Sequence, residues 1–302
     1  MRYRESGQLD TSGVQDRRGG AGRGLAVGGG GLGLVGLVVV VLVQVLGGGG
    51  GTDATSLTGV LGGLGSGQTA DNSRLEQSCR TGADANNSVD CAVVADIQSI
   101  QDYWERTLGA RYQPADTVFF SGSVQTGCGG ATSGSGPFYC PADQLVYIDL
   151  SFFQDLHTRF GAQGGAFVNA YVLAHEYGHH VQKLLGTNQQ VAPGETGPTS
   201  GSVRLELQAD CYAGTWAEHA STVPDASGQP LITDITTDDI ARALDTAGRI
   251  GDDFIQQNLG NGRVDQKSFT HGSSQQRQRW FSTGYTSGDP NQCDTFGTTT
   301  LG

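Results

Sequence analysis

The sequence is poor in basic residues and contains no C-x-x-C pair. It holds 18 Lys and Arg against 30 Asp and Glu, for a formal net charge of -12 at pH 7. Residues 1–23 carry five arginines and three acids, so the rest of the chain has 13 basic and 27 acidic residues. Such an acidic domain is a poor candidate for binding nucleic acid. The missing C-x-x-C pair argues against a zinc module built on cysteines.

The cysteines are few but even in number, and all six follow the first hydrophobic segment. An even number in a domain outside the cytoplasm indicates disulfides. Two intervals of twelve residues look like local loop closures and leave one pair over. The spacing therefore favours Cys79–Cys91, Cys128–Cys140 and Cys211–Cys293, and six reduced, buried thiols are the alternative.

One long uncharged stretch, residues 25–46, divides the chain; its 22 residues include a single polar side chain, Gln44. That length can span a bilayer. Arginines precede it and the next basic residue is Arg74, so the positive-inside rule places the N-terminus in the cytoplasm. A cleaved signal peptide is the alternative, but no A-x-A site follows. We expect a cytoplasmic polar and basic segment of little structure (1–24), a transmembrane helix (25–46), a Gly/Ser/Thr-rich linker (47–70) and an extracytoplasmic domain at the cell surface or in the periplasm (71–302).

Residues 71–302 show the patterns of a mixed α+β domain, mainly helical with a small sheet. Apolar residues recur at helical spacing, and Gly186 follows one such segment as a stop signal. Short apolar and β-branched runs predict the strands. The expected helices are 89–109, 166–185, 202–219 and one that opens at Thr237 and includes Phe254, and the expected strands are 116–120 and 144–150.

The helix expected at 166–185 contains the pattern H-E-x-x-H at His175, Glu176 and His179. Residues four apart lie on one face of a helix, so both imidazoles can bind one metal ion. Glu176 can then reach a water molecule without binding the metal, as in zinc peptidases. The flanking residues are apolar nearly all round, which predicts a buried helix. Buried imidazoles and a carboxylate need a partner, and Zn²⁺ supplies one.

A catalytic zinc site needs a third protein ligand. The metzincin continuation is excluded, because its glycine and histidine positions hold Gln182 and Leu185. Thermolysin-like gluzincins carry an E-x-x-x-D pattern on a later helix, and Glu206 and Asp210 match it. This resemblance implies that Glu206 is the third ligand and that Asp210 orients a ligand histidine. The alternative for Glu206 is an ordinary surface acid.

Two further histidines, His180 and His271, lie outside the H-E-x-x-H ligand pair. His180 follows His179 but points about 100° away from it on a helix, so it cannot share the same metal. His271 lies in a Gly/Ser turn after both ligand helices. A downstream histidine that donates to the developing oxyanion recurs in gluzincins, and this is the catalytic role expected of His271. Helix capping or packing is the alternative.

Long motifs along the chain resemble the bacterial neutral zinc metallopeptidases. They include Ser6-Gly-Gln-Leu, Val14-Gln-Asp-Arg-Arg, Phe138-Tyr-Cys-Pro, HEYGHHVQ at 175–182, Glu206-Leu-Gln-Ala-Asp-Cys-Tyr-Ala-Gly and Thr270-His-Gly-Ser-Ser. The resemblance covers nearly the full length. It implies a zincin-like metallopeptidase domain that binds Zn²⁺ and cleaves peptides or proteins, without identifying the substrate.

The sequence therefore favours a membrane-anchored, zinc-dependent endopeptidase with Glu176 as general base. Residues 146–150 are a candidate edge strand along which an extended peptide could lie. The rival interpretation is a membrane-anchored binding or assembly protein with a structural or latent zinc site. A fourth protein ligand, such as His271, would favour that rival, because structural zinc sites close all four positions.

Overall fold

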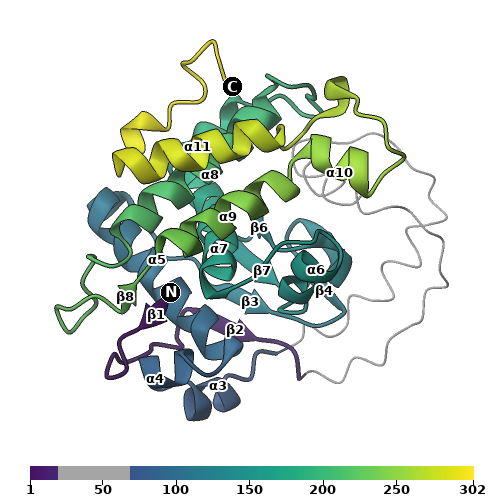
Figure 1. The fold of residues 1–302 in the computed structure, drawn as a ribbon. Helices are drawn as coiled ribbons and strands as arrows, with labels where there is room; N and C mark the ends of the chain where they lie inside the picture. The colour runs from purple at the N-terminus through teal and green to yellow at the C-terminus, as the bar shows by residue number, and fades with distance from the viewer. Residues whose placement is uncertain (20–68) are drawn as a thin grey trace.

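The computed structural model describes residues 1–19 and 69–302, and it has the expected α+β architecture with helices dominant (Figure 1). The helices form where apolar residues recur at helical spacing, and most bury one face. Their bounds are α3 Ser73–Ser78, α4 Gly82–Ala85, α5 Val89–Leu108, α6 Phe152–Thr158, α7 Ala166–Leu185, α8 Gly201–His219, α9 Thr237–Arg249, α10 Asp252–Asn258 and α11 Ser274–Ser287.

Short strands form one four-stranded sheet and two two-stranded sheets within the described residues. The larger sheet has the order β2-β3-β7-β6, in which β6 is antiparallel to β7 and the other neighbours are parallel. Its edge strands are therefore β2 and β6, and the prediction that residues 146–150 form the edge is wrong, because β7 pairs on both sides. The bounds are β1 Arg2–Tyr3, β2 Val14–Asp16, β3 Thr117–Phe119, β4 Ser123–Thr126, β5 Gly129–Thr132, β6 Phe138–Cys140, β7 Leu145–Ile148 and β8 Ile232–Asp234.

The N-terminal residues belong to the same fold as the rest of the chain. Strand β1 pairs with β8, and β2 adds to the sheet beside β3. Tyr3 is buried and its hydroxyl donates to Asp96 at 2.8 Å, while Arg18 pairs with Asp16 and Asp90. The prediction of a separate, little-structured segment at 1–24 is thus wrong for residues 1–19, and the domain includes them as well as 71–302.

The predicted transmembrane helix at 25–46 lies outside the described residues, as does most of the predicted linker at 47–70. Among the helices that the structure describes, none has the length and apolar character needed to cross a bilayer.

Helix α7 lies near the centre of the molecule, between the sheet and the helices α8, α9 and α11 (Figure 1). Helix α8 packs directly on it, and α11 covers α8 in turn. Helices α7 and α8 approach closely at Gly178, where a Cβ atom would meet the Cα atom of Ala209 at 3.0 Å. A glycine between the two histidines of the motif thus lets the second helix approach.

All three predicted disulfides are confirmed: Cys79–Cys91, Cys128–Cys140 and Cys211–Cys293. Two expected elements differ from the prediction. The helix that opens at Thr237 ends at Arg249, because Gly251 lies against the backbone of Ser274 and a new helix begins at Asp252. Residues 121–136, a Gly/Ser/Thr-rich stretch where the sequence predicts a loop and no strand, contain the hairpin of β4 and β5.

Candidate metal centre

Helix α7 carries His175, Glu176 and His179 on the wall of a cavity of about 480 Å³. The helix ends where predicted, because Gly186 adopts the left-handed conformation with φ of 76° and its N–H satisfies helix carbonyls. His175 and Glu176 are buried, whereas His179 is half-buried. The two imidazole rings lie 4.8 Å apart, as their spacing of one helical turn requires.

Glu206 on α8 lies against both histidines. Its Oε2 atom is 3.2 Å from Nε2 of His175, and its Oε1 atom is 3.4 Å from Nε2 of His179. One ligand atom from each of the three residues lies within 4.8 Å of the others. Two imidazole nitrogens and a carboxylate oxygen at this separation suit a zinc ion, which takes three such protein ligands in catalytic sites.

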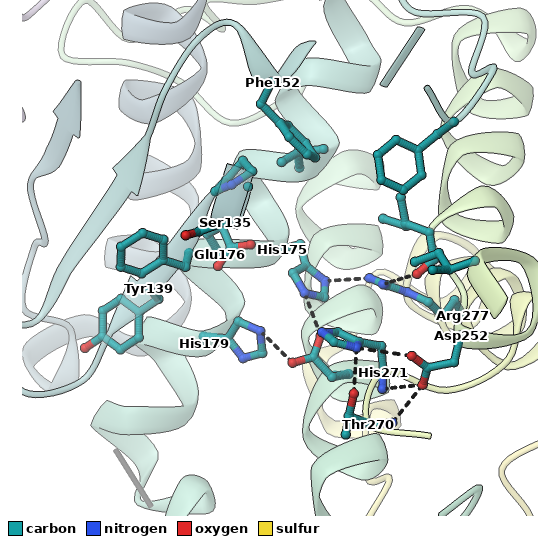
Figure 2. A pocket seen from close by; sticks show the side chains of 18 of the residues that line it. Ser135, Tyr139, Phe152, His175, Glu176, His179, Asp252, Thr270, His271 and Arg277 are labelled. Carbon is teal, nitrogen blue, oxygen red and sulfur yellow. Dashed lines mark hydrogen bonds and ion pairs between the residues drawn. The ribbon is translucent and has the colours of Figure 1, made fainter. Parts of the chain in front are cut away.

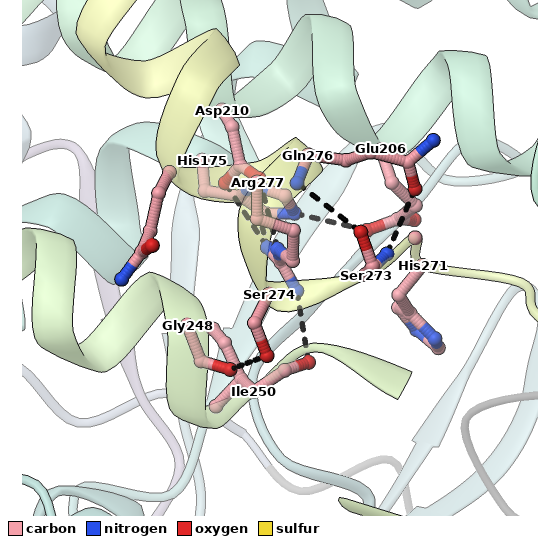
Figure 3. A network of polar contacts seen from close by, with 12 residues as sticks. His175, Glu206, Asp210, Gly248, Ile250, His271, Ser273, Ser274, Gln276 and Arg277 are labelled. Atoms are coloured by element: carbon pink, nitrogen blue, oxygen red, sulfur yellow. Dashed lines mark hydrogen bonds and ion pairs between the residues drawn. The ribbon is translucent and has the colours of Figure 1, made fainter. Parts of the chain in front are cut away.

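Asp210 lies one helical turn after Glu206 and contacts the other nitrogen of His175, Nδ1, at 2.8 Å. The Tyr171 hydroxyl donates to the same carboxylate at 2.7 Å. Arg277 donates to it from Nε at 2.8 Å and Nη2 at 3.0 Å (Figure 3). Asp210 thereby fixes the ring of His175 so that Nε2 faces the cavity. Asp210, which the sequence predicts to orient a ligand histidine, thus lies in contact with His175.

The carboxylates around His175 change its proton affinity. Burial alone would lower the pKa of His175, but Asp210 and Glu206 outweigh it and raise the pKa to about 10. Burial alone would raise the pKa of Asp210, but Arg277 and His175 lower it to about 2. The imidazoles of His179, His271 and His175 hold the pKa of Glu206 well below its usual range despite burial. The site therefore favours a positive charge, which a metal ion would supply.

His271 lines the same cavity, on the side of Arg277 and Asp252 (Figure 2). Asp252, the first residue of α10, accepts hydrogen bonds from the backbone N–H groups of Thr270, His271 and Gly272 at 2.7, 2.7 and 3.0 Å. Its other oxygen lies 3.4 Å from Nδ1 of His271. Burial opposes protonation, but Glu206 and Asp252 raise the pKa of His271. Ser273, rather than His271, caps α11.

Comparison with known proteins agrees with this geometry. Residues 1–296 match the family described as "Putative neutral zinc metallopeptidase". The chain belongs to this family. The match includes the N-terminal strands as well as the residues of the metal site.

Relatives of this chain occur in two bacteria. The uncharacterized protein Rv2575 of Mycobacterium tuberculosis strain H37Rv is 51% identical over 225 residues, which cover 74% of this chain and 76% of the relative. The uncharacterized protein YpfJ of Escherichia coli strain K12 is 39% identical over 299 residues, 97% of this chain and 99% of the relative. No solved structure matches the chain.

Within the described residues, no fourth His, Cys, Asp or Glu joins the cluster of His175, His179 and Glu206. His180 instead turns away, accepting from the Tyr139 hydroxyl at Nδ1 and donating from Nε2 to the carbonyl of Gln113. The cluster therefore has three protein groups, the number found in catalytic rather than structural zinc sites.

Sequence reasoning missed three residues that position the site: Tyr171, Asp252 and Arg277. A signal for Arg277 was present, because Arg277, Trp280, Phe281 and Gly284 recur at helical spacing and are all buried. A buried arginine on such a face requires a carboxylate partner. Asp252 offered no comparable signal, since its partners lie 18 to 20 residues away in an irregular turn.

Proposed function

We propose that this protein is a zinc-dependent endopeptidase of the gluzincin type. The observation that carries the proposal is the convergence of His175, His179 and Glu206 at one point, with Glu176 on the wall of the same cavity. Zinc held by the three residues would polarise a peptide carbonyl and make a water molecule acidic enough to lose a proton near neutral pH. Three ligands with a neighbouring glutamate favour this enzyme over a binding protein with a structural site.

Residues of this chain transfer the proton and stabilise the charge that develops during the reaction. Glu176 accepts the proton from the attacking water and passes it to the leaving amine. His271, whose pKa Glu206 and Asp252 raise, donates to the negative charge that develops on the carbonyl oxygen. Asp210 and Arg277 keep His175 in one orientation throughout.

The edge strand β6 is the proposed support for an extended substrate. Residues 136–139 and Glu176 line the same cavity, so a peptide paired with β6 would pass over the site. Tyr139 is linked to α7 by the 3.1 Å contact of its hydroxyl with Nδ1 of His180. The Cys128–Cys140 disulfide fixes the end of the strand. These two links fix the position of β6 relative to Glu176.

We further propose that the domain works outside the cytoplasm, at the cell surface or in the periplasm, attached to the membrane through residues 25–46. The three disulfides favour an oxidising compartment. Because β1 and β2 belong to the same fold, the proposal places residues 1–19 in that compartment too. This replaces the sequence-based expectation of a cytoplasmic N-terminus.

The experiment is to measure bound zinc and peptide hydrolysis for the native chain, Glu176→Gln and Glu206→Ala. We expect about one zinc per chain in the native protein and in Glu176→Gln, with hydrolysis only in the former. Glu206→Ala is expected to lose both the bound zinc and the hydrolysis. Hydrolysis by Glu176→Gln would contradict the mechanism. Zinc without hydrolysis by the native protein would favour the binding or assembly protein.

A further inference from the structure

The cavity has two chemically different ends, separated by the metal-site residues. Towards the start of α7 its wall is apolar, with Phe152, Phe160, Val172 and Ile250. Arg249 donates to the carbonyl oxygen of Phe160 at 3.1 Å, which places Ile250 near that wall. In Figure 2, Phe152 lies on one side of His175 and Thr270 on the other. This wall suits a bulky apolar side chain of a substrate.

Towards the end of α7 the wall carries a cation, Lys183. Lys183 lies one helical turn after His179, and so on the face of the helix that carries the metal site. The ion pairs of the described residues do not include Lys183. The two arginines that line the cavity are paired: Arg159, at the apolar end, with Asp155 at 3.6 Å, and Arg277 with Asp210. The ammonium group of Lys183 is therefore available to a ligand in the cavity.

Asn188 supplies an independent sign of a ligand at the same end. It lines the cavity, and its Oδ1 atom is buried without a hydrogen-bond partner among the described residues. A buried carbonyl oxygen left unpaired is unfavourable. The N–H group of a bound peptide would satisfy it once the Asn188 side chain turns toward the cavity. A cation and an acceptor on the wall of one cavity match the two features of a peptide with a carboxylate group.

We propose that Lys183 and Asn188 form a carboxylate-binding subsite, so that the enzyme prefers peptides with a carboxylate near the scissile bond on the side away from the apolar wall. The inference rests on the proposed peptidase function. Four residues of helix rise about 6 Å, and an extended peptide rises about 3.3 Å per residue. The carboxylate would therefore lie about two residues from the cleaved bond, as an acidic side chain or as the terminal carboxylate.

The protein's net charge of -12 does not prevent a substrate carboxylate from binding beside Lys183. At physiological ionic strength charges are screened beyond about 8 Å, so distant carboxylates act weakly on a bound substrate. Lys183 in contact with the substrate carboxylate is not screened in this way. An ion pair in a partly enclosed cleft is expected to change kcat/KM by about five- to tenfold.

The test uses the zinc-loaded full chain and matched peptides. Cleavage sites in a mixed peptide pool, identified by mass spectrometry, fix the register. Peptides are then compared with Glu, Gln or Lys at the proposed position, each with a free or amidated C-terminus. We expect Glu or a free terminus to raise kcat/KM about five- to tenfold over the neutral peptide. The Glu/Gln and acid/amide pairs distinguish the two sources of the carboxylate.

Lys183→Met is expected to bring the ratio of kcat/KM for the Glu peptide to kcat/KM for the neutral peptide to about one. Lys183→Glu is expected to reverse the preference, so that the Lys peptide is cleaved best. Lys267→Met is the matched control, because it is the chain's other lysine, is exposed and does not line the cavity. It is expected to keep the native ratio. A native ratio retained in Lys183→Met, or no preference in the native enzyme despite cleavage, overturns the subsite alone. Zinc binding without any cleavage overturns the peptidase function and the subsite together.

Discussion

The backbone N–H of Asp71 donates to the carbonyl oxygen of Asp16 at 2.8 Å, so the two ends of the fold that flank residues 20–68 meet. The Asn72 side chain strengthens this junction: it donates to the carbonyl of Val14 at 2.6 Å and accepts from the N–H of Asp16 at 2.9 Å. Arg18 and Arg74 both pair with Asp90 beside it. A single membrane crossing by residues 25–46 would place these partners on opposite sides of the bilayer.

Replacement of residues 20–68 by a linker of about six Gly and Ser residues is expected to preserve the fold and the metal site. The junction is already closed by direct hydrogen bonds, so a short linker spans it without strain. We expect native zinc content and native thermal stability, but no sedimentation with membranes. Metal analysis, thermal unfolding and membrane fractionation measure these properties.

The contrasting variant removes residues 1–68 entirely. It loses β1 and β2, exposes the edge of β3 and leaves the buried Asp96 without the Tyr3 hydroxyl. Burial of Val14 alone contributes about 1.5–3 kcal/mol. The truncated chain is thus expected to be far less stable in urea than the linker variant. Equal stability of the two would contradict the structural role of the N-terminal strands.

Sequence patterns predict the elements whose stability is local. Residues 166–185 have an apolar helical period and a glycine stop, and α7 has those bounds. The short polar strand at Val14–Asp16 has no such signal, because its stability comes from β3, about a hundred residues later in the chain. The break before Asp252 likewise depends on Ser274, which packs against Gly251.

The residues of the candidate site likewise fall into those that a local sequence pattern predicts and those that it does not. His175, Glu176 and His179 follow from one helical spacing, and Glu206 with Asp210 follows from a second pattern on another helix. The residues that hold these groups are set by tertiary contacts. Asp252 accepts from a turn that only the fold brings near, so no spacing in the sequence identifies it.

Asp210→Asn is expected to weaken zinc binding about 10- to 100-fold, because His175 loses the carboxylate that orients it. It also leaves the buried Arg277 without its counter-charge, at a cost of about 3–5 kcal/mol in stability. Zinc titration with a competing chelator and urea unfolding measure the two effects. The double variant Asp210→Asn/Arg277→Met is expected to regain stability but not zinc affinity. Recovery of both would show that Asp210 acts only through Arg277.

Asp252→Ala is expected to lower kcat about 100-fold while zinc content stays at the native level. The change removes the acceptor for three N–H groups of the 270–272 turn, so His271 is no longer held toward the cavity. Asp253→Ala is the matched control: the neighbouring acid holds Ser274 instead. Peptide hydrolysis and metal analysis on both variants compare the two roles. An equal loss of kcat in both variants would argue against a specific role for His271.

Zinc binding is expected to release at least about one proton at pH 7. The pKa of His175 is raised to about 10, so its imidazole is protonated at pH 7 in the metal-free protein, whereas a zinc ligand must be neutral. Zinc affinity is therefore expected to rise with pH, by up to about tenfold per unit, until pH 10. The stability of the metal-free form changes in the opposite direction. A raised pKa stabilises the fold below the unfolded value of about 6.5, and this contribution is lost as pH rises toward 10.

Calorimetric titration with zinc at pH 7, in two buffers of different ionisation enthalpy, counts the released protons. The same titration of Asp210→Asn is expected to release fewer, since the pKa of His175 falls when its principal carboxylate partner is removed. Zinc binding with no proton release in the native protein would mean that His175 is already neutral. The attraction between His175 and its two carboxylates would then be too weak to outweigh its burial.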